Sequence, residues 1–552
     1  MKLMNNWIFK SILKQKPFVN CKYYSTEKVN ESAKNKYMSV IGLEVHAQID
    51  SNTKLFSSAG TSFVSPVNSQ VDVFDMALPG TLPVLNKRCV EVAVLTGIAL
   101  NCQIAKTSSF DRKHYFYADM PGGYQITQQR NPIATQGFID FIVYKNDFEK
   151  SYMKRCNLKQ IQIEQDSGKS LQDLENNRSL VDLNRAGIGL LEFVFEHDLT
   201  NEDEAVCLVK ELILILKRIQ VCTCKMNEGA LRVDANISVN QPGQPYGVRT
   251  EVKNLNSFRF MKEALKYEIQ RQIAQLEKGN QVVNETRMYD NKRRETIAMR
   301  DKEVVQDYRF MPEPNLPPIY LSDDKDNHDP SLINILEIKE KITILPDVDR
   351  KVLLEKYSLD LSQVFTLMND PGMMQLFENI MDLFDSKENI NEIYKFIHSD
   401  LRNVLENKNS SFEDCLDDCQ RIYQVIKMLL NKEISMGTAY DVTELLFQDK
   451  RSPTEIVETY GWKMICDQDQ LKQLCLEAVL ANEKIAKKYM RKKVKRPKSV
   501  MVHHVLKAIN NRANEEEIWK MIDHLLFVEK IFQNDKGIDP NIDPNIDPKS
   551  EN

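Results

Sequence analysis

The chain has 552 residues, of which 42% are hydrophobic, and it carries a formal net charge of -5. This length predicts several domains. The slightly negative net charge excludes a protein whose whole surface is basic and binds nucleic acid, but it is compatible with a local basic patch. No uncharged apolar run reaches the roughly 18 residues of a membrane span, and the 11 scattered cysteines lack paired metal-site spacing, which predicts reduced thiols.

The first 36 residues differ in kind from the rest. Between Met1 and Thr26 the chain carries five lysines and no acid, and its apolar residues recur at spacings that one side of a helix can gather. Basic, amphipathic segments of this kind are typical of organelle transit peptides. Residues 1–36 are therefore predicted to be a transit segment that is cleaved on import, with a disordered tail as the alternative.

Two regions of different pattern follow. Alternating apolar and polar residues, interrupted by turn residues, fill the chain from 37 to 328 and predict a β-rich domain. From residue 329 long amphipathic stretches such as 390–405 and 419–430 predict helices, and glycine nearly disappears. The predicted fold class is α+β, with an antiparallel sheet domain followed by helical material.

The helical material is predicted to divide into a domain over 329–468 and a tail domain over 469–535. The second part contains a basic cluster, which predicts salt-dependent phosphate contacts, with an ordinary solvated helix face as the alternative. The last residues, 536–552, repeat Asp-Pro every fourth position, which forbids regular helix or sheet pairing and predicts a disordered tail. The basic residues expected to contact nucleic acid are Lys492, Lys493, Lys495 and Arg496.

Four predicted strands carry a polar face. Because side chains alternate across a strand, the segment Ile41–Ile49 directs its apolar side chains one way and Glu44, His46 and Gln48 the other. The same alternation gives a polar face to three further strands, at 160–166, 231–239 and 247–253. Their polar side chains are Gln160, Gln162, Glu164 and Asp166, then Arg232, Asp234, Asn236 and Ser238, then Arg249, Glu251 and Lys253.

These faces combine carboxylates, an imidazole and guanidinium groups. A polar strand face is ordinarily just solvated, which is the simpler interpretation, but Asp and Asn are disfavoured within strands. Mg²⁺ takes hard oxygen ligands together with substrate phosphates, and Arg or Lys stabilises a transferred phosphoryl group. The four faces therefore indicate a metal–phosphate site, although the chain has no Walker loop, dinucleotide fingerprint or nucleophile elbow.

A mixed aromatic and basic segment, Phe110–Tyr117, precedes a Pro-Gly-Gly turn. It is interpreted either as a surface that stacks and pairs with a nucleotide end or as an ordinary core turn.

A series of short motifs runs in a fixed order between residues 37 and 320. They are Ile41–His46, Leu78–Asn86, Phe110–Lys113, Tyr115–Tyr117, Gly123–Gln125, Asp166–Ser170, Val181–Arg185, Leu231–Ser238, Glu251–Phe258, Glu285–Arg287 and Asp307–Pro314. In order and spacing they resemble the B subunit of the aspartyl/glutamyl-tRNA amidotransferase. The transit-like start makes the mitochondrial form the nearest match.

The resemblance implies a catalytic cradle of antiparallel sheet, a helical domain and a helical tail that contacts tRNA. It implies a carbon–nitrogen ligase of the glutamine-hydrolysing glutaminyl-tRNA synthase type. Such an enzyme uses ATP and Mg²⁺ to convert Glu-tRNA(Gln) into Gln-tRNA(Gln) through a γ-phosphoryl-glutamyl-tRNA. Ammonia would come through a tunnel from a separate amidase (A) subunit, and a small C subunit would complete a heterotrimer in the mitochondrial matrix.

The resemblance also assigns residues. It implies that Glu44 and His46 form a metal-site pair and that Glu164 and Asp166 belong to the family's acidic segment. Lys113 matches a basic residue that the family places near the tunnel mouth. With the polar strand faces, the predicted catalytic residues are Glu44, His46, Lys113, Glu164, Asp166, Arg232, Asp234, Glu251 and Lys253, and the predicted Mg²⁺ ligands are Glu44, His46, Glu164 and Asp166.

Two departures from the family pattern matter. The family's His-x-Glu-Glu-Asp segment has Gln162 and Gln165 here in place of a His and a Glu. Ser57, Asp72 and Asp75 stand where some members have three of four zinc-binding cysteines, so no structural zinc is expected.

Two other functions therefore stay open at this point. One is a tRNA-binding scaffold whose catalytic site has decayed, which the two glutamines suggest. The other is a metal hydrolase that uses Glu44 and His46 on a small substrate without tRNA or partner subunits.

Overall fold

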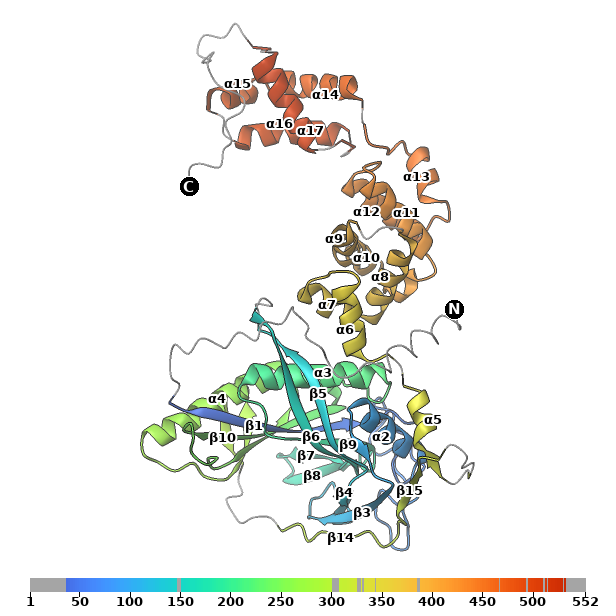
Figure 1. Cartoon of the computed structure of the whole chain (residues 1–552), viewed down its shortest axis with the longest axis vertical. Helices are drawn as coiled ribbons and strands as arrows, with labels where there is room; N and C mark the ends of the chain where they lie inside the picture. The colour runs from blue at the N-terminus through green and yellow to red at the C-terminus, as the bar shows by residue number, and fades with distance from the viewer. Residues whose placement is uncertain are drawn as a thin grey trace. The chain divides into compact units, whose positions relative to one another are not determined.

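The computed structural model describes residues 36–532 except 146–149, 300–306, 325–328, 330–331, 343, 385–387, 466, 493–494, 510–511, 514 and 530. The chain forms two compact units that divide between Asp349 and Arg350. The first unit contains the sheets and the second is helical, which confirms the predicted α+β class (Figure 1). The predicted transit segment and Asp-Pro tail lie outside the described residues, and the other predicted domain boundaries stay predictions.

A nine-stranded sheet forms the centre of the first unit. Its strand order is β13-β12-β11-β10-β1-β9-β6-β5-β2. Neighbouring strands are antiparallel except for the parallel pair β11 and β12. The strands are β1 (Met38–Gln48), β2 (Gln103–Ile104), β5 (Ala134–Val143), β6 (Tyr152–Gln165), β9 (Gly189–Phe195), β10 (Leu231–Asn240), β11 (Thr250–Leu255), β12 (Thr286–Asp290) and β13 (Glu295–Ala298).

One face of this sheet is apolar because the strand residues alternate as predicted. In β1, the side chains of Ile41, Leu43 and Val45 belong to the buried core and are at most 1% exposed. Three helices pack on the sheet and contribute to the same core, which leaves the opposite face to the polar side chains (Figure 1). They are α2 (Lys87–Ala99), α3 (Glu202–Arg218) and α4 (Phe258–Glu277).

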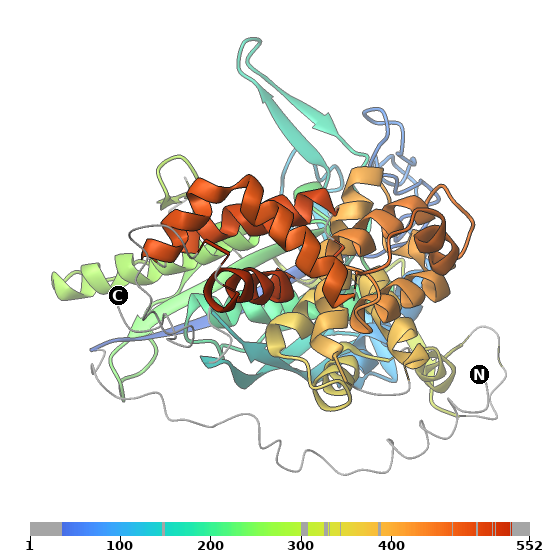
Figure 2. The same ribbon diagram turned by 90° about the horizontal axis from the view of Figure 1, so that it is seen from above.

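Two smaller sheets complete the first unit. One is built around β3 (Thr107–His114), which pairs with β4 (Tyr124–Asn131). The other is a hairpin of β7 (Lys169–Asp173) and β8 (Arg178–Asp182), which projects from the domain in Figure 2. The remaining elements are β14 (Met311–Pro312), β15 (Ile319–Ser322), β16 (Ile333–Asn334), η2 (Met226–Glu228) and α5 (Ile335–Glu340), and α6 (Pro346–Glu355) crosses the division between the units.

The second unit is helical throughout its described residues. The helix predicted at 419–430 is confirmed as α11, whereas the stretch 390–405 is α9, a π-helical turn η3 and α10 in succession. No described helix combines the length and apolar character that a membrane crossing requires. The elements are α7 (Leu361–Met368), α8 (Pro371–Leu383), α9 (Ile390–Lys395), η3 (Phe396–Leu401), α10 (Arg402–Lys408), η4 (Glu413–Cys415), α11 (Cys419–Leu430), α12 (Met436–Leu446), α13 (Pro453–Thr459), α14 (Gln468–Ala481), α15 (Glu483–Lys492), α16 (Lys495–Ala508), α17 (Glu515–Asp523) and η5 (His524–Val528).

Two predicted strands have different limits in the structure. The strand expected at 247–253 begins only at Thr250, because a connection containing Pro and Gly runs up to that residue, so the exposed Arg249 lies outside β11. The strand expected at 160–166 is the end of the longer β6, and Asp166 follows directly after it. Most of the aromatic and basic segment 110–117 is strand β3, which ends at His114.

Candidate metal and phosphate site

The register of the large sheet brings the predicted polar faces side by side. His46 of β1 lies opposite Arg232 of β10 on one side and opposite Glu192 of β9 on the other. Glu192 is in turn opposite Gln162 of β6. Four polar side chains therefore form a row across four adjacent strands, on the face that the core does not cover.

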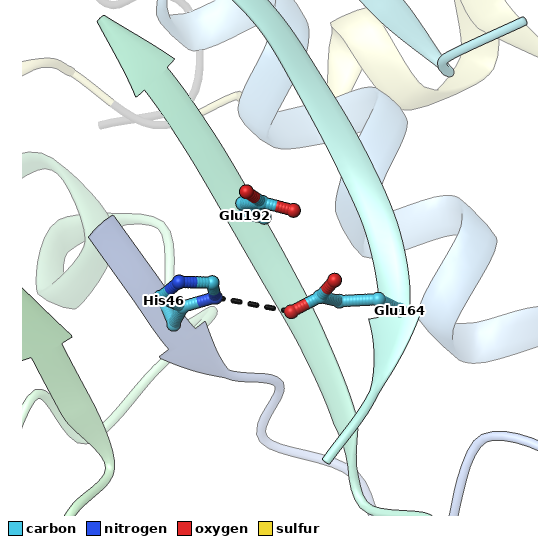
Figure 3. A group of neighbouring side chains, drawn as sticks. All are labelled: His46, Glu164 and Glu192. Atoms are coloured by element: carbon cyan, nitrogen blue, oxygen red, sulfur yellow. Dashed lines mark hydrogen bonds and ion pairs between the residues drawn. The ribbon is translucent and has the colours of Figure 1, made fainter. Parts of the chain in front are cut away.

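His46, Glu164 and Glu192 form a close group in this region (Figure 3). Nδ1 of His46 is 3.0 Å from Oε1 of Glu164. Each of the three residues offers one ligand atom, and these atoms all lie within 4.8 Å of one another. One imidazole and two carboxylates at this separation can hold a divalent cation and leave further positions for water or phosphate.

Burial and charge act in opposite directions on this group. Burial disfavours a charged imidazole, but the hydrogen bond and negative charge of Glu164 outweigh it and raise the pKa of His46 to about 9. Burial also opposes a charged Glu164, yet His46 lowers the pKa of that carboxyl to about 2. For Glu192, burial and then the neighbouring charge of Glu164 raise the pKa to about 8. A bound cation would favour the deprotonated forms of all three groups, because its charge replaces the protons that they hold.

Asp166 anchors the end of this face through several donors. Its carboxylate accepts hydrogen bonds from Nη2 of Arg232 at 2.8 Å and from Nε2 of Gln48 at 3.2 Å. The Nε atom of Arg185 is 3.6 Å away. Because Asp166 is only 2% exposed, these partners balance a buried negative charge.

Glu44 and Asp234 occupy the next row and lie opposite each other on β1 and β10. The side-chain amide of Asn236 donates to Oε1 of Glu44 at 3.0 Å. Asp234 accepts the backbone N–H of Asn254 at 2.8 Å, at the irregular point of the β10–β11 pairing. Both carboxylates thus already have a donor from a side chain or the backbone of the sheet.

Two lysines border the face. Nζ of Lys253 lies 3.3 Å from Oε1 of Glu251 on the same strand. Burial opposes the charged form of Lys253, but the negative charges of Glu251 and Asp234 outweigh it and raise the pKa of Lys253. Lys113 of β3 lies with Nζ 4.7 Å from the ring centre of Tyr308, and its charge acts on Glu164 and Glu192.

All nine predicted catalytic residues belong to this part of the first unit. Glu192, which comes from the middle strand of the three, is not among the residues predicted from the sequence. A signal was present, because Glu192 is the sole charged residue of the otherwise apolar strand β9. An isolated carboxylate in such a strand is costly unless it has a specific role or partner.

The basic residues predicted to contact nucleic acid lie in the second unit. Lys492 ends α15, and Lys495 and Arg496 begin α16, whereas Lys493 and the side chains of the whole cluster lie outside the described residues.

The positions that replace the zinc cysteines lie in the first unit and form a different contact. Nζ of Lys54 donates to Oδ2 of Asp75 at 2.8 Å, and the hydroxyl of Ser57 donates to Asp75 Oδ1 at 3.1 Å. The expectation that the protein has no structural zinc stays a prediction.

Comparisons with known proteins agree with this architecture. A family model described as the GatB/GatE catalytic domain matches residues 39–326, and one described as the GatB domain matches residues 375–526. The B subunit of the mitochondrial glutamyl-tRNA(Gln) amidotransferase of Drosophila melanogaster is 44% identical over 507 residues, which cover 92% of this chain and 98% of that protein. The Homo sapiens protein of the same name is 44% identical over 509 residues, 91% of this chain and 90% of its own length. The B subunit of the aspartyl/glutamyl-tRNA(Asn/Gln) amidotransferase of Rickettsia canadensis is 37% identical over 479 residues, 87% of this chain and 95% of its own length.

Proposed function

This chain belongs to the GatB/GatE family of amidotransferase B subunits, and we propose that it converts misacylated Glu-tRNA(Gln) into Gln-tRNA(Gln) in mitochondria. In this proposal it is the ATP-using subunit of a heterotrimer with an amidase (A) subunit and a small C subunit, in the matrix. The names of its relatives support the reaction and the compartment. The polar face of the large sheet supports the location of the chemistry.

The observation that carries the proposal is the group of His46, Glu164 and Glu192, with its ligand atoms within 4.8 Å of one another. We assign these residues to hold Mg²⁺. In this assignment Glu192 is a ligand, and two of the ligands predicted from the sequence are not. Those two are Glu44, which accepts from Asn236, and Asp166, which accepts from Arg232. They act as positioning residues.

The proposed reaction has two chemical steps. The γ-carboxylate of the tRNA-bound glutamate attacks the γ-phosphorus of ATP, the bond to the β-phosphate oxygen breaks, and ADP leaves with an acyl phosphate formed. Ammonia then attacks the acyl carbon, loses a proton, and inorganic phosphate leaves to give the amide. Bound Mg²⁺ would neutralise phosphate charge.

The chain's own residues serve these steps through charge and position. Lys113 and Lys253 are the cations at the border of the face, where they can bind phosphate oxygens and oppose the charge that develops on them. Arg232 keeps Asp166 in place and lies opposite His46. The carboxylates of this face would otherwise repel an anionic substrate, so these cations are needed for binding.

The alternative proposal is a tRNA-binding scaffold without chemistry. The observation behind it is Gln162, which lies in the row opposite Glu192 and carries no charge. Its Oε1 accepts a hydrogen bond from the hydroxyl of Thr127 at 3.3 Å. Gln162 therefore makes a neutral contact at a position where the family has an ionisable side chain.

One experiment separates the two. The purified complex is given Glu-tRNA(Gln), ATP, Mg²⁺ and free ammonium, and both Gln-tRNA and inorganic phosphate are measured. Glu164→Gln should abolish both products, whereas Glu196→Gln, which removes an exposed carboxylate just after β9, should leave both unchanged. Amidation that persists in the Glu164→Gln complex would remove this face as the active site, and no amidation in the unchanged complex would favour the scaffold.

A further inference from the structure

The β7–β8 hairpin stands apart from the other sheets. Among the described residues its two strands pair only with each other, so no further strand lies along either outer edge. It projects from the first unit (Figure 2). A two-stranded hairpin is marginally stable by itself in water and normally packs against something else.

One face of the hairpin has an apolar centre between two charged pairs. Residues at alternate positions share a face, and cross-strand partners lie on the same side. The pair at the turn end is an ion pair, with Nε of Arg178 2.8 Å from Oδ2 of Asp173. The three cross-strand pairs of this face are Lys169–Asp182, Leu171–Leu180 and Asp173–Arg178.

The apolar centre is open to solvent. Leu171 is 46% exposed, Leu180 is 45% exposed, and Leu174, the first residue of the turn, is 84% exposed. The opposite face of the same strands is mostly polar and includes Gln172 and Ser179. An apolar centre within a charged rim is the usual anatomy of a protein–protein interface.

A neighbouring loop extends this surface. The side-chain amide of Asn68 donates to the carbonyl of Val181 at 3.0 Å, and its oxygen accepts from the backbone N–H of Leu183 at 2.7 Å. These bonds tie the loop to the base of the hairpin. The loop also exposes apolar side chains, because Val67 is 70% exposed and Phe63 is 66% exposed.

The hairpin is joined directly to the candidate site. Only Ser167 and Gly168 separate Asp166, which holds Arg232, from the first residue of β7. After β8 the chain returns to the same place, where the Arg185 side chain donates to the carbonyls of Ser167 at 2.9 Å and Gly168 at 2.6 Å. Whatever covers the hairpin therefore lies beside the end of the catalytic face.

We propose that the Leu171–Leu180 face of the hairpin, with the adjoining loop around Val67, docks the subunit that supplies ammonia. The proposal rests on the proposed function, because that reaction needs ammonia made by another chain and delivered near Glu164. Both ends of the hairpin converge next to Asp166, so a subunit seated on it is held beside the place where ammonia is used. Its own surface should be apolar at the centre with charges at the rim.

The test uses the full-length chain co-expressed with its amidase and small subunits. Leu171→Glu puts a charge at the centre of the face, and Gln172→Glu puts the same charge on the opposite face of the same strand. We expect Leu171→Glu to weaken association with the amidase at least about tenfold, as for the centre of an interface. Amidation driven by glutamine should fall with it, while amidation driven by free ammonium persists. Gln172→Glu should match the unchanged complex in every assay.

Three results would overturn the proposal. The first is unchanged association of the Leu171→Glu chain, and the second is an equal loss for both variants. The third is a chain that dimerises alone and becomes monomeric with Leu171→Glu, because the occupant would then be a second copy. If the Leu171→Glu chain folds poorly, the same test is made with Leu180→Glu, which puts a charge on the same face from β8. It should show the same loss of association. Failure of the proposed function would give a different result: the complex with the unsubstituted chain would make no Gln-tRNA even with free ammonium.

Discussion

Nδ1 of His46 lies 3.0 Å from Oε1 of Glu164, although 118 positions separate the two residues and their strands do not pair with each other. The strand between them, β9, contributes Glu192 to the same group. The contact thus depends on the register of three strands at once. A cation at this point would be held by the assembled sheet rather than by any local motif.

We predict that Glu192→Gln raises the Mg²⁺ concentration needed for half-maximal ATP consumption by at least about tenfold. Even groups behind a metal ligand change metal affinity by about 10–100-fold, so loss of a ligand charge should do no less. The measurement is a Mg²⁺ titration of phosphate release by the complex with Glu-tRNA(Gln). Glu196→Gln, just after the same strand, is the matched control, and equal Mg²⁺ curves for the two variants would exclude Glu192 as a ligand.

Arg232→Ala is expected to lower the free energy of unfolding by about 3 kcal/mol, because it leaves the nearly buried Asp166 with one donor fewer. The matched control is Arg155→Ala. Arg155 makes a similar contact with Asp140 at 2.6 Å, but its side chain is 52% exposed. The control should cost no more than about 1 kcal/mol. Urea denaturation measures both, and similar losses would show that burial does not set the strength of the Arg232 contact.

Much of this arrangement could be predicted from residue patterns. Alternation in β1 correctly placed Glu44, His46 and Gln48 on the face opposite the core, and amphipathic spacing gave the limits of α11. Alternation works there because polar side chains recur at every second position of β1, which marks a whole polar face.

The same pattern failed at Glu192. Its neighbours on the same face, Leu190 and Val194, are apolar, so β9 shows no polar face to detect. Strand order also cannot be obtained from alternation. The alternation of side chains along a strand determines the face on which each one lies, but not which strand lies beside it. The contact of His46 with Glu164 therefore required the structure.

The pH dependence of stability should include a contribution from Glu204. Burial opposes its charged form, but Lys154 at 2.8 Å, the Thr200 backbone N–H and the Tyr152 hydroxyl outweigh it and hold the pKa of Glu204 below its usual 4.5. A lowered pKa in the folded state stabilises the fold above pH 4.5, and this stabilisation is lost as the pH falls through the folded value.

Glu204→Gln should therefore flatten the fall in unfolding free energy below pH 4.5. Urea denaturation at a series of acidic pH values measures this slope. Glu202→Gln removes a carboxylate from the same first turn of α3 without the Lys154 contact. The idea fails if the two variants show the same slope.

The ion pair of Lys54 and Asp75 should be structurally important, because neither side chain is more than 1% exposed. Lys54→Met leaves a buried carboxylate without its cation and is expected to cost about 3–5 kcal/mol. The double variant Lys54→Met/Asp75→Asn removes both charges and should recover most of that loss. Chemical denaturation of the unchanged protein, the single variants Lys54→Met and Asp75→Asn, and the double variant gives the coupling. A double variant as unstable as Lys54→Met would contradict it.

Replacement of Lys492, Lys493, Lys495 and Arg496 by Gln should weaken tRNA binding and reduce its salt dependence. Each phosphate contact contributes about 0.7–0.9 to the slope of log K against log salt, so the loss of four contacts should lower that slope by about 3. Binding of the complex to Glu-tRNA(Gln) is measured from low to moderate salt. The control replaces four exposed lysines of the same unit, Lys427, Lys432, Lys450 and Lys463, by Gln, which removes the same charge. Only the loss of phosphate contacts should depend on which basic residues are replaced. If both variants lower the slope equally, the effect comes from overall charge and not from contacts at the α15–α16 connection.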